Sequence, residues 1–375
     1  MSDGAPLFLP VGFQRFHRSR FIDYQLNRAH SLGWADAADL HCGAAQLRRR
    51  ADLPGVFETI AEEAASHGRH RAAAGSMRIA EFFTAGSDPV KVERRYRRFR
   101  ELADLGVPAL ASARVEIDYR DGFLPCYRLP GSGRGTVLVH GGFDSLIEEF
   151  LGIWQRIAAA GFDVIAFDGP GQGGARRLAG LPFEHDWERP VAAVLDRFEL
   201  DRASLVGMSM GGHWALRAAA YEERIDRVVS WPPVYDWLLR VPAVLRPATR
   251  WMLGRRRFMR WSIRTRARLV PTLATVVDQA LYIMDATDPV AVVDWFLAMN
   301  PRQVASERIT QAVLVLIGEH DRFQPPQLAR AQIAALTNAR SVSTRIFTAA
   351  EHADQHCQLG NLSLAVQVLL DWLEG

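Results

Sequence analysis

From Ala113 onward, short apolar runs alternate with segments of helical periodicity, and this alternation constrains the fold more than any other feature. Continuous apolar runs are typical of strands that are buried on both faces. The pattern therefore predicts an α/β fold with a doubly wound, mostly parallel, eight-stranded sheet. The predicted strands are VEIDY (115–119), FLPCYRL (123–129), TVLVH (136–140), FDVIAFD (162–168), SLVGM (204–208), RVVSW (227–231), AVLVLIG (312–318) and SVSTRIF (341–347). Predicted helices cover residues 146–160, 189–198, 211–221, 326–336 and 362–373.

Two segments fall outside this alternation. Apolar residues at three- and four-residue spacing in 52–105 predict two helices, from Gly55 to Phe83 and from the AGSDP break to Leu105. About seventy residues at 231–299 also have helical spacing, where a minimal crossover needs about a dozen. We therefore expect an N-terminal helical cap region (1–112), an α/β core (113–231 and 301–375) and a helical lid inserted after the sixth strand (232–300).

The strongest chemical signal is the hexapeptide GMSMGG at 207–212, which directly follows an apolar strand and precedes a helix. Glycines two positions before and after Ser209 allow a sharp turn that presents the serine hydroxyl above the sheet. This strand, turn and helix context predicts that Ser209 is a nucleophile.

A nucleophilic serine needs an acid and then a histidine later in the chain. Asp321 follows the strand at 312–318 and is the predicted acid, with Glu319 as the runner-up. The base is expected after the last strand, where His352 and His356 compete and spacing leaves them nearly even. His320 is a weaker candidate because it adjoins the acid instead of following the final strand.

Acyl chemistry also needs N–H donors for the developing oxyanion. One is expected from Met210, the residue after the nucleophile. The other is expected from the glycine turn after the strand at 136–140, where Gly142 is the preferred donor and Phe143 the alternative.

A second glycine turn, at 169–174, matches a bare G-x-G-x-x-G pattern. No helix clearly opens on it and no acid follows at the next strand end, so we interpret it as a wall of the active site and expect no cofactor. The pairs His67 with His70 and His41 with Cys42 lack third and fourth ligands, so we expect no metal.

Lys91 is the only lysine, so arginine carries almost all of the positive charge in a chain of net charge +3. Three runs concentrate the arginines, at 48–50, 94–100 and 255–268. We interpret the last run as a helix with an arginine face and an apolar face containing Phe258, Trp261 and Ile263. Nucleic-acid binding is not expected.

The composition, 49% hydrophobic and 23% charged, is that of a globular protein. No apolar run is long enough to span a bilayer, and the N-terminal charge pattern is the reverse of a secretory signal. We therefore expect a cytoplasmic protein without a membrane partner. Three widely separated cysteines predict no disulfide framework.

The HGG turn, DGPGQG, GMSMGG, GEHD and a late histidine occur in the order of the α/β-hydrolase superfamily, which this sequence resembles. The stretch HGGFDS-x-x-EE (140–149), the HCQ at 356–358 and EFFTAGSDPVK (81–91) resemble a narrower group. That group contains the 2,6-dihydroxypseudooxynicotine hydrolase, the fungal polyketide chain-shortening hydrolases and the FrsA-like proteins. The resemblance implies that the N-terminal region joins the lid and that His356 is the base.

Members of that group cleave esters or carbon–carbon bonds next to a carbonyl without a cofactor. The resemblance thus implies a serine hydrolase acting on a small-molecule carbonyl substrate. Because the predicted lid is rich in aromatic residues, we expect this substrate to be medium-sized and partly aromatic or polyketide-like. Aromatic residues that could line a lid are Trp231, Tyr235, Trp237, Trp251, Trp261, Tyr282, Trp295 and Phe296. The alternatives are an acyltransferase or cyclase of secondary metabolism with the same triad, and a non-catalytic binding protein on this fold. A homodimer is left open.

Overall fold

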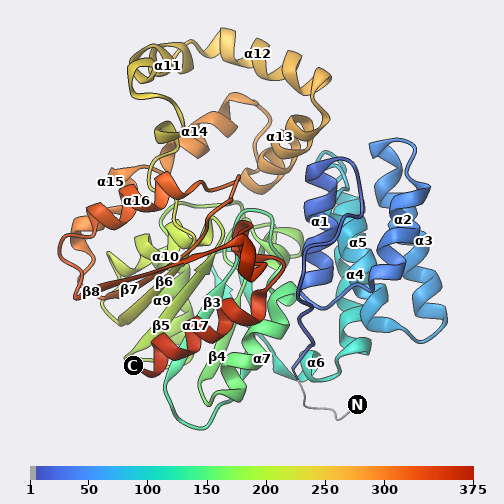
Figure 1. Cartoon of the computed structure of the whole chain (residues 1–375), viewed down its shortest axis with the longest axis horizontal. Helices are drawn as coiled ribbons and strands as arrows, with labels where there is room; N and C mark the ends of the chain where they lie inside the picture. Colours follow the sequence, from blue (N-terminus) through green and yellow to red (C-terminus); the bar gives the residue numbers. More distant parts are fainter. Residues whose placement is uncertain (1–5) are drawn as a thin grey trace.

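The computed structural model describes residues 6–375 and contains an eight-stranded sheet of order β1-β2-β4-β3-β5-β6-β7-β8 (Figure 1). β1 pairs antiparallel with β2, β2 pairs antiparallel with β4, and every other neighbouring pair is parallel. The predicted fold class is confirmed. The strands are β1 Arg114–Tyr119, β2 Gly122–Leu129, β3 Thr136–His140, β4 Asp163–Phe167, β5 Ala203–Met208, β6 Ile225–Trp231, β7 Ala312–Gly318 and β8 Ser341–Phe347.

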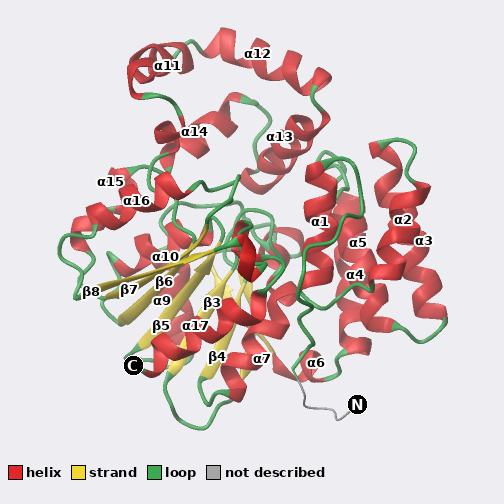
Figure 2. Cartoon of the chain, viewed as in Figure 1, coloured by secondary structure: helices red, strands yellow, loops and turns green. Residues whose placement is uncertain are grey.

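Helices cover both faces of the sheet (Figure 2). Alternate residues of the central strands belong to two separate hydrophobic clusters, as the two-residue period of a strand requires. One face packs against α7 (Leu151–Ala159) and α17 (Leu362–Glu374), and the other packs against α9 (Glu188–Arg197), α10 (Gly211–Ala219) and α16 (Pro326–Ala335). The parallel strands therefore end at one edge of a sheet that is buried on both sides, and the loops that follow them lie at that edge.

The N-terminal region is helical, but its helices differ from the predicted ones. The expected single helix from Gly55 to Phe83 is two helices, because the chain turns at 67–69 and packs the second helix against the first. Because of this turn, the apolar faces of the two helices are both buried. In a single straight helix, part of this apolar surface would face solvent. The helices are α1 Arg20–Ser31, α2 Ala37–Gln46, α3 Leu53–Ser66, α4 His70–Phe82, α5 Pro89–Gly106 and α6 Ala109–Ala113.

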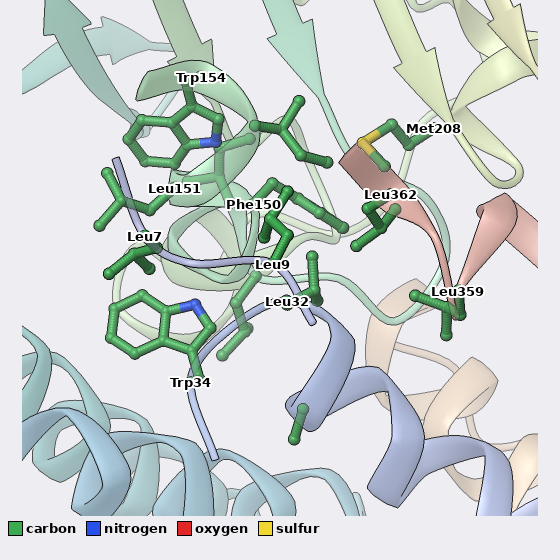
Figure 3. Packing of buried hydrophobic residues seen from close by; sticks show 14 of the residues in the cluster. Leu7, Leu9, Leu32, Trp34, Phe150, Leu151, Trp154, Met208, Leu359 and Leu362 are labelled. Carbon is green, nitrogen blue, oxygen red and sulfur yellow. The ribbon is translucent and has the colours of Figure 1, made fainter. Parts of the chain in front are cut away.

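The N-terminal helices share one hydrophobic cluster with the sheet face that carries α7 and α17. Figure 3 shows Leu7 and Leu9 of the N-terminal segment packed between Trp34 and the α7 residues Leu151 and Trp154. All five side chains are less than one-tenth exposed. Removing this region would therefore expose apolar surface on the sheet layer itself.

The segment between β6 and β7 forms a helical arm above the sheet (Figure 1). Its helices are α11 Arg246–Leu253, α12 Arg256–Leu269, α13 Pro271–Met284, α14 Val290–Ala298 and α15 Pro301–Val304. Only part of the expected apolar face of α12 is buried: Ile263 and Met259 pack inward, whereas Phe258 is 46% and Trp261 is 63% exposed. The expectation that Phe258, Trp261 and Ile263 share one apolar face was wrong, because Phe258 and Trp261 lie on the opposite side of the helix from Ile263.

No helix within residues 6–375 is both long enough and apolar enough to cross a membrane.

Candidate active site

Ser209 lies in the sharp turn between β5 and α10. Its φ of 57° is left-handed, a strained conformation for a residue with a side chain. The turn is held by the Ser209 N–H, which donates to the carbonyl of Trp231 on β6 at 2.6 Å. At Gly207, a Cβ atom would lie 2.0 Å from the carbonyl oxygen of Gly211, so only glycine fits at this position. The glycine at position 207 is thus required by the close approach of β5 and α10.

Three side chains predicted from the sequence are connected by hydrogen bonds at this edge of the sheet. Ser209 Oγ is 2.8 Å from Nε2 of His356, and Nδ1 of His356 is 2.6 Å from Oδ2 of Asp321. The other oxygen of Asp321, Oδ1, accepts from the N–H groups of Phe323 and Gln324, both at 2.8 Å. Because Asp321 is only 3% exposed, these contacts fix the carboxylate in one orientation.

The protonation of His356 depends on two opposing effects. Burial disfavours the charged imidazolium, but the facing carboxylate of Asp321 favours it, and the net result is that the pKa of His356 is raised well above 6.5. The arrangement therefore stabilises the positive charge that the imidazole would acquire on taking a proton from Ser209.

The competing sequence candidates are not at this site. His352 is exposed, as is His320, whose Nδ1 is 3.0 Å from Asp354 Oδ2. Glu319 accepts from the N–H of Ala349 at 2.7 Å. None of the three lines the cavity that contains Ser209.

The two predicted oxyanion donors adjoin the Ser209 side chain. A Cβ atom built on Gly142 would lie 2.7 Å from Ser209 Cβ and 3.0 Å from the nitrogen of Met210, so the two loops are in direct contact. The side-chain nitrogen of Gln324 donates to the carbonyl of Pro232 at 3.1 Å, and its side-chain oxygen accepts from the N–H of Met210 at 3.1 Å. Phe143, the alternative donor, also lines the cavity.

The glycine turn after β4, at 169–174, is hydrogen-bonded to the loop that contains Gly141 and Gly142. A short helix, α8 (Gly173–Arg177), does open on it, contrary to expectation. The side chain of Gln172 donates to the carbonyls of Gly141 and Gly142 at 2.8 and 2.9 Å, and Asp168 accepts from the N–H of Ile147 at 3.0 Å. The turn does not line the Ser209 cavity, so its interpretation as a wall of the site was wrong. It holds the donor loop in place.

A cavity of about 290 Å³ opens over Ser209 and His356. Most of its walls are apolar or aromatic. The aromatic side chains are those of Phe21, Tyr24, Phe143, Phe150, Trp237, Phe296 and Phe323. Of the lid aromatics considered from the sequence, only Trp237 and Phe296 line it. Trp251 and Trp261 are exposed on the arm, and Trp231 is fully buried beneath the site.

Sequence reasoning missed the contribution of α1. Tyr24 and Arg28, one turn apart on this helix, line the cavity, and the Tyr24 hydroxyl donates to the carbonyl of His356 at 3.3 Å. Burial is the main cause of a raised pKa for Tyr24, which keeps the phenol protonated as a donor. The amphipathic sequence RFIDYQLNRAHS was the available signal for this helix.

No group of three or more His, Cys, Asp or Glu side chains in residues 6–375 is arranged to hold a metal ion.

The sequence profile of the Alpha/beta hydrolase family matches residues 136–358, more than half of the chain. The chain belongs to this family. The matched segment begins at β3, and it contains the Ser209 turn, Asp321 and His356. The family resemblance expected from the motifs is confirmed.

Two fungal proteins illustrate the relationship. This chain is 30% identical over 292 residues to Hydrolase phmG of Phaeosphaeria nodorum, covering 63% of its own length and 64% of the relative. It is 34% identical over 206 residues to Hydrolase acrC of Aspergillus aculeatus, covering 46% of this chain and 47% of the relative. The chain thus spans about half to two-thirds of the length of these curated relatives.

Two solved structures share the fold over nearly the whole chain. The crystal structure of the 2,6-dihydroxy-pseudo-oxynicotine hydrolase has a TM-score of 0.62 at 20% identity and covers 92% of this chain and 94% of that one. The structure of wild-type AbyA5 has a TM-score of 0.68 at 19% identity and covers 90% of each chain. At these identities the similarity concerns the fold.

Proposed function

We propose that this α/β hydrolase is a serine hydrolase that cleaves a carbon–carbon, ester or thioester bond next to a carbonyl. In this proposal Ser209 is the nucleophile, His356 is the general base and then the general acid, and Asp321 orients His356. The observation that carries the proposal is the continuous hydrogen-bonded path from Ser209 Oγ through His356 to Asp321, with donor–acceptor distances of 2.8 and 2.6 Å.

The reaction begins when the hydroxyl of Ser209 transfers its proton to Nε2 of His356 and the oxygen attacks the substrate carbonyl. The N–H groups of Met210 and Gly142, with that of Phe143 as the alternative to Gly142, donate to the resulting oxyanion. As the tetrahedral intermediate collapses, the leaving group departs as an alkoxide, thiolate or stabilised carbanion and takes the proton from His356. Water, deprotonated by His356, then attacks the acyl-serine and releases the acid.

The substrate is proposed to be a medium-sized, partly aromatic or polyketide-like metabolite. A cavity of about 290 Å³ is large enough for such a molecule, and its many aromatic side chains favour planar, conjugated groups. The three-part division also belongs to this proposal, with the N-terminal region (1–112) and the inserted lid (232–300) covering a core of 113–231 and 301–375. Residues of all three parts line the cavity: Tyr24, Trp237 and Ser209 are examples.

Active-site labelling tests the nucleophile. A fluorophosphonate probe is expected to add its mass once per chain, and Ser209→Ala should abolish labelling. Ser145 also lines the cavity, so Ser145→Ala is the matched control and should still be labelled once. Labelling that survives Ser209→Ala, or that is lost only in Ser145→Ala, would overturn the assignment. Release of 4-nitrophenol from a short-chain 4-nitrophenyl ester by the wild type, and not by Ser209→Ala, would establish turnover.

A further inference from the structure

Apart from His356, which pairs with Asp321, the charged side chains of the cavity are three arginines and one carboxylate: Arg28, Arg240, Arg322 and Asp144. Arg28 is neutralised, because Nη1 is 2.8 Å from Asp144 Oδ1 and Nε is 2.9 Å from Glu149 Oε2. Although burial raises the pKa of Asp144, the neighbouring positive charges, chiefly Arg28 and then Arg78, together lower it below its usual value, so the carboxylate is ionised. The positive charge left over in the cavity therefore belongs to the other two arginines.

Arg240 lies near the start of the lid and is the last residue of a short turn, η3 (Trp237–Arg240). Its Nη1 donates to the carbonyl of Phe323 at 2.9 Å, its Nη2 is 3.4 Å from the carbonyl of Arg322, and the guanidinium lies 5.4 Å from the centre of the Trp237 ring. No carboxylate in residues 6–375 forms an ion pair with it. Burial lowers the pKa of Arg240 while Asp321 acts in the opposite direction, and the guanidinium stays charged at neutral pH.

Arg322 follows the proposed catalytic acid directly in the chain. It is exposed at the cavity, and within the described part of the chain its side chain makes neither a hydrogen bond nor an ion pair. By contrast, Arg256 and Arg260 on the outer arm pair with Asp294 and Asp288. The two arginines at the cavity are thus close in space, joined through the backbone at Arg322 and Phe323, and both lack a counterion.

We propose that Arg240 and Arg322 form an anion-binding subsite at the cavity that contains Ser209, and that the substrate carries a carboxylate which this subsite binds. The inference rests on the proposed hydrolase function and specifies its substrate class. A planar carboxylate can accept two parallel bonds from a guanidinium, and the aromatic walls hold the apolar part of the same molecule. A bound carboxylate would supply the missing counterion for both arginines.

A pair of esters that differ in one charge tests this subsite. Mono-4-nitrophenyl adipate carries a free carboxylate, and its methyl ester is the neutral counterpart of similar length. For the wild type we expect kcat/KM to be roughly five- to tenfold higher for the carboxylate, because charge-assisted hydrogen bonds favour the bound carboxylate and the exposure of both arginines to water keeps the gain modest. The ratio should fall as salt is added.

Substitutions assign the preference to the two arginines. Arg322→Gln changes charge without breaking any hydrogen bond, and it should reduce the ratio of the two kcat/KM values about threefold. Arg322→Glu should bring the ratio below one. Arg240→Gln should reduce the ratio as well, and Arg240→Lys should restore part of it. Arg330→Gln is the matched control, because Arg330 is an exposed arginine on α16 that does not line the cavity, and its ratio should equal that of the wild type.

The outcomes separate this inference from the function on which it rests. If neither ester is hydrolysed in a Ser209-dependent manner, the proposed hydrolase function fails. If the neutral ester is hydrolysed but the wild type shows no preference for the carboxylate, or if Arg322→Glu keeps the preference, the anion subsite alone is overturned.

Discussion

Arg78 Nε donates to Glu149 Oε1 at 2.8 Å, and this bond joins α4 of the N-terminal region to the segment that follows β3. Both side chains are almost completely buried. Glu149 also pairs with Arg28, and its backbone carbonyl accepts from Nε1 of Trp34 at 2.9 Å. A single carboxylate thus connects two N-terminal helices to the loop that carries Gly142.

Removing this carboxylate is expected to destabilise the whole chain. Glu149→Ala leaves the guanidinium of Arg78 buried with fewer partners, and breaking a buried ion pair costs roughly 3–5 kcal/mol of the free energy of unfolding. Urea denaturation followed by circular dichroism measures the loss. Glu63→Ala is the control, because Glu63 is exposed and its carboxylate has no partner in residues 6–375. Equal effects of the two substitutions would contradict the structural role of Glu149.

The two histidines after β8 are expected to differ sharply in function. His356→Ala removes the group that hydrogen-bonds Ser209, so we expect kcat/KM for a 4-nitrophenyl ester to fall about 10³-fold or more. His352→Ala alters an exposed side chain outside the cavity and should stay within about twofold of the wild type. A steady-state assay of both variants checks this difference. A larger loss of kcat/KM in His352→Ala than in His356→Ala would indicate that His352 is the base.

Three strands were predicted with the correct residues at both ends, although only β7 is buried throughout and β8 is largely exposed or half-buried. TVLVH, AVLVLIG and SVSTRIF correspond residue for residue to β3, β7 and β8. In β7 every residue is buried, so the apolar run and the strand have the same ends. The helix α1 went unrecognised because Asn27 and Ser31 are polar and yet fully buried, with hydrogen-bond partners elsewhere in the chain.

The site was predictable where its chemistry depends on a local turn, and less so where it depends on tertiary packing. Ser209 and Gly142 lie in turns whose glycines are visible in the sequence. Tyr24 contacts His356 although the two residues are 332 positions apart in the sequence, and no local sequence pattern predicts such a contact. The lid aromatics show the same limit, since helical spacing does not reveal that Trp237 faces the cavity while Trp251 faces solvent.

The pH dependence of the reaction follows from the environment of His356. Only the neutral imidazole can accept the Ser209 proton, so activity should fall as pH falls through the pKa of His356. Burial lowers the pKa of His356, but Asp321 and Cys357 together raise it above its usual value, so the midpoint of the acid limb of kcat/KM is expected above pH 6.5. Asp321→Asn removes the negative charge, so the midpoint should move to lower pH while kcat falls roughly 10³–10⁴-fold. If the midpoint is the same in Asp321→Asn as in the wild type, a group other than His356 causes the acid limb.

The loop that we propose to bind the oxyanion leaves no room for a side chain at Gly142. A methyl group there would lie 2.7 Å from Ser209 Cβ and 2.9 Å from the carbonyl oxygen of Met208, both too close for the loop to keep its position. Gly142→Ala should therefore move the loop N–H groups away from the position of the oxyanion. Loss of one oxyanion donor costs about 10²–10³ in kcat, and we expect a fall in that range with a much smaller change in KM.

Gly55→Ala is the matched control for this substitution, because nothing lies within 4 Å of a Cβ atom at Gly55 and its backbone is helical. We expect its kcat to equal that of the wild type and its stability to increase slightly, since alanine favours a helix. Labelling by the fluorophosphonate distinguishes misplacement from unfolding. A folded Gly142→Ala protein should retain a reactive Ser209, but label more slowly, because the phosphonyl oxygen uses the same donors. Wild-type kcat in Gly142→Ala would show that the N–H groups of this loop do not stabilise the oxyanion, and that Met210 must act with a donor from elsewhere.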